Sequence, residues 1–197
     1  MSSSRDPIEL LVVANDEFAR RLRLVGGDDW RRPTPCSEWD VRALVNHVVG
    51  ANVRYQLLLH GAPTEQVEAT RFVDHLGDDA LASFVETAHG VVACFHEDGA
   101  LERISHHAAG DRTGRELLSM RILDAAIHAW DLARAIGADE TIDDDVVSFL
   151  LEYTADLGPG ALRAFAPQDG HVPRAAPPQA RLLHRLGRHP ATTEEVR

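Results

Sequence analysis

The chain has 197 residues, of which 44% are apolar and 26% are charged, fractions typical of a globular protein with one sizeable core. The formal net charge of −11 argues against non-specific nucleic-acid binding, which requires clustered Lys and Arg. No run of about 18 apolar residues is present, so no membrane span is expected. The N-terminus lacks the apolar segment of a signal peptide, and two cysteines, Cys36 and Cys94, cannot form a disulfide framework. We therefore expect a cytoplasmic protein.

The first half of the chain predicts three helices. The first spans about residues 6–24, because Asp6 is a suitable cap, Pro follows it and Glu stands three residues after it. The second spans about 37–60 and is announced by Ser-Glu-Trp-Asp, which resembles a capping box. Gly50 within it indicates close packing or a slight break. After a polar connection, a third helix is expected over about 79–96.

The second half predicts one long helix and two shorter ones. Residues 100–112 are expected to form a loop, and the fourth helix spans 113–137 between a Thr-x-x-Glu cap and a C-terminal Gly. A fifth is expected over about 143–157 and a short last one over 179–186. The proline-rich stretch 166–178 is expected to be extended. No strand-type alternation of useful length is present.

This pattern indicates an all-α fold, a four-helix bundle with additional short C-terminal helices and an extended tail. We expect a single domain over 1–197, with the bundle at about 6–137 and the remaining helices and tail at 138–197. The sequence leaves a monomer and a homodimer as alternatives.

The fourth helix carries a carboxylate and an imidazole on one face. Asp124 and His128 are four residues apart, and residues at that spacing lie one above the other on a helix. His47 lies at the edge of the apolar stripe of the second helix. Three such side chains with an open position suit a catalytic divalent metal, although an Asp and a His at this spacing also simply hydrogen-bond to each other. Asp131 falls on the same arc, whereas Trp130 points toward packing.

Other candidates carry weaker signals. Cys36 is expected just before a helix N-terminus, where it is either a reactive thiol or, more commonly, a small packing residue. Cys94 is expected in the core. His106 and His107 lie in the expected loop, where one of them is a candidate further ligand. The other histidines are scattered and expected to be solvated: His60, His75, His89, His96, His171, His184 and His189.

Two blocks resemble a known family. Pro33 through Gly50 and Asp124 through Gly137 are similar to the DinB-like, metal-binding four-helix proteins of actinobacteria related to the N-terminal domain of mycothiol-dependent maleylpyruvate isomerase. The tail from Phe165 through Pro190 resembles a subgroup of single-domain members. The resemblance implies a DinB-like bundle in which His47, Asp124 and His128 hold a divalent metal, most often zinc, with nickel or iron also compatible. The characterised pattern has Glu where Asp124 stands, and Asp is one methylene shorter.

The resemblance also implies a chemistry. A metal with an open position lowers the pKa of a bound small thiol such as mycothiol, which then attacks an electrophilic substrate as an S-transferase or isomerase does. Asp131 is a candidate to orient His128. Two alternatives remain open, a metal-binding stress or regulatory protein without catalysis, and a helical interaction module with a vestigial site. The isomerase itself has a second, C-terminal domain, for which this chain has no counterpart.

Overall fold

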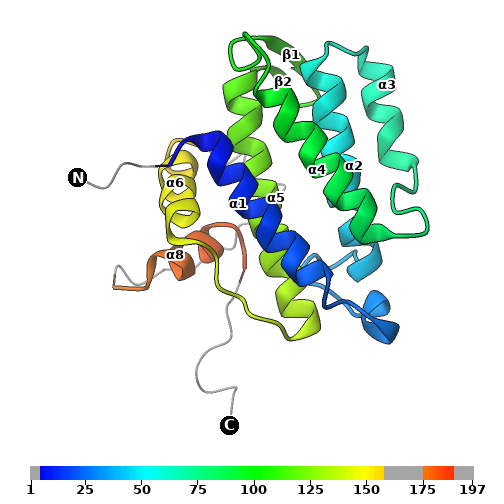
Figure 1. Cartoon of the computed structure of the whole chain (residues 1–197). Coiled ribbons are helices and arrows are strands. Elements are labelled where there is room, and N and C mark those ends of the chain that lie inside the picture. The colour runs from blue at the N-terminus through cyan, green and yellow to red at the C-terminus, as the bar shows by residue number, and fades with distance from the viewer. Residues whose placement is uncertain (1–4, 158–174, 189–197) are drawn as a thin grey trace. The chain divides into compact units, whose positions relative to one another are not determined.

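The computed structural model describes residues 5–157 and 175–188. The chain divides into two compact units, Met1–Thr141 and Ile142–Arg197. Both consist mainly of helices, so the predicted all-α class is confirmed (Figure 1). No helix within the described ranges is long and apolar enough to cross a membrane. The expectation of a single domain over 1–197 stays a prediction.

Two helices begin and end where the sequence places them. The helix α1 (Pro7–Leu22) has a complete capping box between Asp6 and Glu9. The longest helix, α5 (Gly114–Ile136), has a second box between Thr113 and Glu116, and it ends at Gly137, which adopts the left-handed conformation. These caps satisfy backbone N–H groups and carbonyls that a helix end otherwise leaves unpaired, so the ends of α5 are fixed by local sequence.

The start of the second helix differs from the prediction. The helix α2 (Val41–Leu59) is capped by Asp40, which accepts a hydrogen bond from the backbone N–H of Ala43, and not by Ser37. Residues 27–31 form a short 3₁₀ helix, and the segment after it closes a bridge between Pro33 and Asp40. Cys36 therefore lies in this loop rather than at the first turn of α2, and the helix dipole argument for its reactivity was wrong.

Four helices of the first unit pack around a shared core. The helix α4 (Ala80–Phe95) matches the third predicted helix. Contacts join α1 to α4 and α5, and α2 to α4 and α5, which lie side by side in Figure 1. The rings of Phe18 on α1 and Phe84 on α4 lie 4.7 Å apart in this core. Other buried members of the core are Leu22, Val41, Leu44, Val45, Val48, Val49, Ala88, Ala129 and Leu132.

Two connections contain structure that the sequence analysis missed. The polar connection before α4 forms the helix α3 (Thr64–Ala69) and the 3₁₀ turn η2 (Thr70–Phe72). The expected loop 100–112 forms an antiparallel hairpin of β1 (Ile104–His107) and β2 (Gly110–Thr113). Each strand has four residues, too few for an alternating pattern to be visible in the sequence.

The second unit contains the helices α6 (Asp144–Ala155) and α8 (Pro178–Arg185), which contact each other. They match the fifth and last predicted helices to within a few residues. Most of the predicted extended tail, residues 166–174, lies outside the described residues, as do His171 and His189.

Candidate metal centre

The first unit brings the three predicted metal ligands together. His47 comes from α2, and Asp124 and His128 come from consecutive turns of α5, which packs against α2. The Oδ1 atom of Asp124 lies 3.2 Å from Nε2 of His47 and 3.4 Å from Nε2 of His128. All three ligand atoms lie within 4.8 Å of one another. The local i, i+4 spacing sets one pair, and helix packing sets the other.

These distances suit a divalent metal. In a tetrahedral zinc site with bonds of about 2.0–2.1 Å, two neighbouring ligand atoms are about 3.3 Å apart. Both separations involving Asp124 agree with this value, so the shorter Asp side chain reaches far enough in this fold. Neutral imidazoles and a carboxylate also suit nickel and iron. The residues present therefore fit a three-ligand centre with a free position.

The second oxygen of Asp124 is held by Arg121. The Arg121 guanidinium donates to Oδ2 of Asp124, one helical turn away, and forms an ion pair with it. Arg121 is completely buried, and its Nε donates to Oδ1 of Asn52 at 2.9 Å. The guanidinium thus fixes the carboxylate so that only Oδ1 faces the two histidines.

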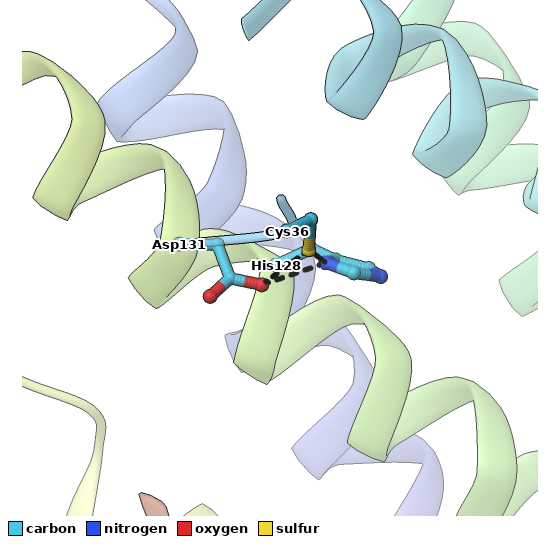
Figure 2. Close-up of side chains that lie close together, drawn as sticks. All are labelled: Cys36, His128 and Asp131. Carbon is cyan, nitrogen blue, oxygen red and sulfur yellow. Dashed lines mark hydrogen bonds and ion pairs between the residues drawn. The ribbon is translucent and has the colours of Figure 1, made fainter. Parts of the chain in front are cut away.

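His128 is oriented through its other ring nitrogen. Its Nδ1 lies 3.0 Å from Oδ2 of Asp131, a carboxylate with no solvent exposure, so Nδ1 carries the proton and donates (Figure 2). The thiol of Cys36 donates to the same oxygen at 3.4 Å, and its Sγ lies 4.0 Å from Nδ1. A carboxylate in this position sets the tautomer of a metal-binding histidine and leaves Nε2 available.

Electrostatics separate the two histidines. Burial lowers the pKa of His47 despite the nearby Asp124, so His47 is neutral and ready to bind a metal. Burial also disfavours a charge on His128, but the carboxylates of Asp124 and Asp131 outweigh it and raise its pKa well above the usual value. For Asp124, burial is outweighed by His128, His47 and Arg121, which hold its pKa well below the usual range. In the metal-free protein, His128 and Asp124 therefore form a charged pair.

A pocket of about 330 Å³ opens beside the centre, with His47 and Trp39 in its wall. The Trp39 ring lies 4.5 Å from the ring of His47 and 5.7 Å from that of His128, measured between centroids. The aromatic ring shields one side of the histidines from water. The centre is thus enclosed on the Trp39 side and accessible from the pocket.

Two further groups of potential ligands occur in the described part of the chain. Cys36, His128 and Asp131 form one of them, which shares His128 with the centre above. The other consists of His60, Cys94 and Glu97, with Nε2 of His60 2.9 Å from Oε1 of Glu97. Arg103 also lies 3.6 Å from Glu97, and a cation there competes with a metal ion.

Neither His106 nor His107 belongs to the groups just described. Nδ1 of His106 lies 2.7 Å from Oδ1 of Asp111 across the hairpin, and the ring of His107 lies 6.4 Å from that of Tyr55. Cys94 is buried, as expected, and Trp130 is buried and packed. Its neighbour Arg134 lies over the Trp130 ring.

The sequence analysis missed Arg121, Asn52 and Trp39 as parts of the site. Arg121 stands three residues before Asp124 on the same helix face, a spacing at which an ion pair is expected. That signal was available. Asn52 was assigned to the buried stripe of α2, where an amide needs a partner, but its partner lies 69 residues away in sequence.

Comparisons with known proteins agree with this arrangement. Two proteins of Mycobacterium tuberculosis, both designated uncharacterised, are 32% identical over 191 residues, which cover 93% of this chain and 98% of theirs. The crystal structure of the mycothiol-dependent maleylpyruvate isomerase matches with a TM-score of 0.58 at 19% identity. The match covers 73% of this chain and 66% of the isomerase chain, so the likeness concerns the fold and one part of that enzyme. A point mutant of the isomerase gives the same values.

A family model described as the mycothiol maleylpyruvate isomerase N-terminal domain matches residues 11–133. This range begins in α1 and ends near the end of α5, and it includes His47, Asp124 and His128. More than half of the chain is matched. The chain belongs to the mycothiol maleylpyruvate isomerase N-terminal domain family.

Proposed function

We propose that this protein binds one divalent metal ion, zinc in preference to nickel or iron, through His47, Asp124 and His128. The observation that carries the proposal is the position of Oδ1 of Asp124, 3.2 and 3.4 Å from the two imidazole nitrogens. The orientation of His128 by Asp131 and of Asp124 by Arg121 supports it, because metal ligands in proteins are held by such partners.

The protein then uses a small thiol of the mycothiol type to attack an electrophile, as an S-transferase or isomerase. A divalent metal with a free position lowers the pKa of a bound thiol and supplies a thiolate at neutral pH. The printed name of the structural relative, an isomerase that depends on mycothiol, suggests the thiol. Family membership makes this activity class the first to test.

The protein side chains bind and orient the reactants. His47 and His128 stay fixed by Trp39 and Asp131, while the pocket beside His47 admits the electrophile. In the reaction the S–H bond breaks and its proton passes to solvent. A sulfur–carbon bond forms as the electron pair of the attacked double bond moves to the neighbouring carbon, which takes a proton in a transferase. In an isomerase the adduct rotates and expels the thiol again.

The pocket favours this catalytic function over metal binding without catalysis. A closed coordination sphere requires a fourth side chain at the centre, and His106 and His107 of the hairpin contact other partners. An accessible volume beside two ligands is typical of a reaction centre.

The test measures thiol consumption by the zinc-loaded protein with mycothiol and maleylpyruvate, and with 1-chloro-2,4-dinitrobenzene as a general electrophile. We expect turnover above the protein-free reaction in wild type and in His89→Ala, and none in His128→Ala. His89 lies on α4 and is not a proposed ligand. Equal rates for wild type and His128→Ala would overturn the proposal.

A further inference from the structure

The pocket beside His47 is strongly cationic. It is lined by Trp39, His47, Arg54, Thr70, Arg71 and His75, among other residues. Two arginines and two histidines thus share a volume of about 330 Å³, although the whole chain carries a formal charge of −11. A local excess of positive charge in an acidic protein calls for a specific explanation.

Arg54 is the most unusual of these residues. It is only 7% exposed, yet within the described part of the chain its guanidinium makes no hydrogen bond and no ion pair. Burial lowers its pKa, and the charge of Arg71 adds to this effect. Buried charges in proteins are almost always paired, because removing an unpaired ion from water is costly.

Two other buried arginines of the same unit show the usual arrangement. Arg21 donates to the carbonyl oxygens of Glu17, Asp139 and Thr141. Arg121 donates to Asp124 and Asn52.

Asp124 attracts Arg54 electrostatically but does not pair with it. Both oxygens of this carboxylate are already engaged, one with Arg121 and the other with the two histidines. The remaining acid near the pocket is Glu68, which pairs with Arg71 at 2.7 Å. Arg54 therefore has free donors that face the pocket.

The backbone of α2 is adapted to keep this space. A Cβ atom at Gly50 would lie 2.7 Å from Cδ2 of His75 and 3.3 Å from Nη1 of Arg54. A Gly in a helix interior costs about 1 kcal/mol relative to Ala, so its position here is explained by the close approach of these side chains. His75 is itself fixed, since its Nε2 donates to the carbonyl of Thr70 at 2.7 Å and its backbone N–H donates to Asn46.

We propose that this pocket binds an oxyanion, a carboxylate of the electrophilic substrate, and that Arg54 determines this specificity. The inference rests on the proposed function, because it places the reactive part of the substrate beside the metal ligand His47, which shares the pocket wall. A guanidinium presents two parallel N–H donors that match a carboxylate, and the bound anion supplies the charge that Arg54 lacks. The substrates are therefore small electrophiles with at least one carboxylate, and neutral analogues bind poorly.

The experiment measures binding by isothermal titration to the zinc-loaded protein, with maleate as the probe. Dimethyl maleate serves as the neutral control, and inorganic phosphate tests whether any oxyanion suffices. We expect maleate to bind in preference to both, and Arg54→Met to weaken its binding by roughly 10- to 100-fold. Arg54→Lys should fall between the two, because it keeps the charge and loses the paired donors. Arg115→Met is the matched control, since Arg115 is an exposed arginine paired with Glu102 away from the pocket.

A second readout separates binding from folding. Removal of an unpaired buried charge should leave the melting temperature of Arg54→Met equal to or above that of wild type, whereas loss of a structural arginine lowers it. Unchanged maleate affinity in Arg54→Met, or equal affinity for dimethyl maleate, would overturn the inference, as would tighter binding of phosphate. Zinc content is measured on the same samples. Loss of maleate binding with zinc retained supports the inference, and absence of zinc from wild type with Arg54-dependent maleate binding contradicts only the proposed function.

Discussion

Arg121 and Asp124 stand one turn apart on α5, and the buried guanidinium holds one oxygen of the carboxylate while the other oxygen faces His47 and His128. This ion pair decides which atom of Asp124 is offered to a metal. It also connects the centre to α2, because Arg121 donates to Asn52 as well. The geometry of the centre thus depends on a residue that is not itself a ligand.

Replacing Arg121 tests this connection. Arg121→Met leaves Asp124 and Asn52 without their donor, so we expect the metal-free protein to lose about 3–5 kcal/mol of unfolding free energy, the usual cost of breaking a buried pair. Chemical denaturation measures this loss. Arg115→Met removes an exposed pair and should change stability by less than about 1 kcal/mol. Equal effects of the two substitutions would contradict the role of Arg121.

Asp131 is expected to act through His128 rather than as a ligand. Asp131→Asn keeps the size of the side chain but removes the charge that holds the proton on Nδ1 of His128. We expect zinc affinity to fall by about 10- to 100-fold while one metal ion still binds. Competition with a chromogenic chelator measures the affinity, and Asp98→Asn, a change after the end of α4, is the control. Complete loss of stoichiometric zinc would indicate that Asp131 itself is a ligand.

The length of the acidic side chain gives a third prediction. Asp124 Oδ1 already lies at the separation expected in a zinc site, and Glu would extend the carboxylate by about 1.5 Å. We therefore expect Asp124→Glu to weaken zinc binding by about tenfold, because the added methylene also displaces the pair with Arg121. Tighter binding by this variant in the chelator competition would show that reach limits the natural site.

The raised pKa of His128 predicts a reversal of pH dependence on metal binding. Without metal, the stabilisation from the His128–Asp124 pair is fully present below about pH 6.5, the unfolded value for His, and it is lost as pH rises through the folded pKa. The lowered pKa of Asp124 places the acid limit: its contribution is present above about pH 3.9 and is lost as pH falls through the folded value.

Zinc must displace the proton of His128, so zinc affinity should rise with pH. Titration in buffers of different ionisation enthalpy should detect the release of about one proton per zinc ion near pH 6. In His128→Ala, melting temperatures should no longer show the decline between pH 6 and 9 that this pair produces. Zinc binding without proton release in wild type would contradict the charged pair.

Much of the fold follows from local signals in the sequence. The caps at Asp6 and Thr113 and the C-terminal Gly137 place helix ends correctly, because each satisfies backbone groups with residues close by in the chain. The start of α2 was misplaced because Ser37 and Asp40 are both good caps, and the bridge of Asp40 with Pro33 decides between them. That bridge depends on tertiary structure, as does the hairpin over 104–113.

The centre was predictable only in part. Asp124 and His128 follow from helical spacing, and His47 was added by an edge position and a family resemblance. The cationic pocket was not predictable, because Arg54 looks like an ordinary solvated residue until α3, η2 and His75 fold over it. Burial of a charge is a property of packing, and a single sequence does not contain it directly.

The central claim is the metal centre, and metal content tests it most directly. Elemental mass spectrometry of untagged wild-type protein should give about one zinc ion per chain, with the same value for His89→Ala and none for His47→Ala or His128→Ala. Zinc should also raise the melting temperature of wild type and not of these two variants. Unchanged metal content in His128→Ala, or no metal in wild type together with no thermal stabilisation by added zinc, would contradict the account.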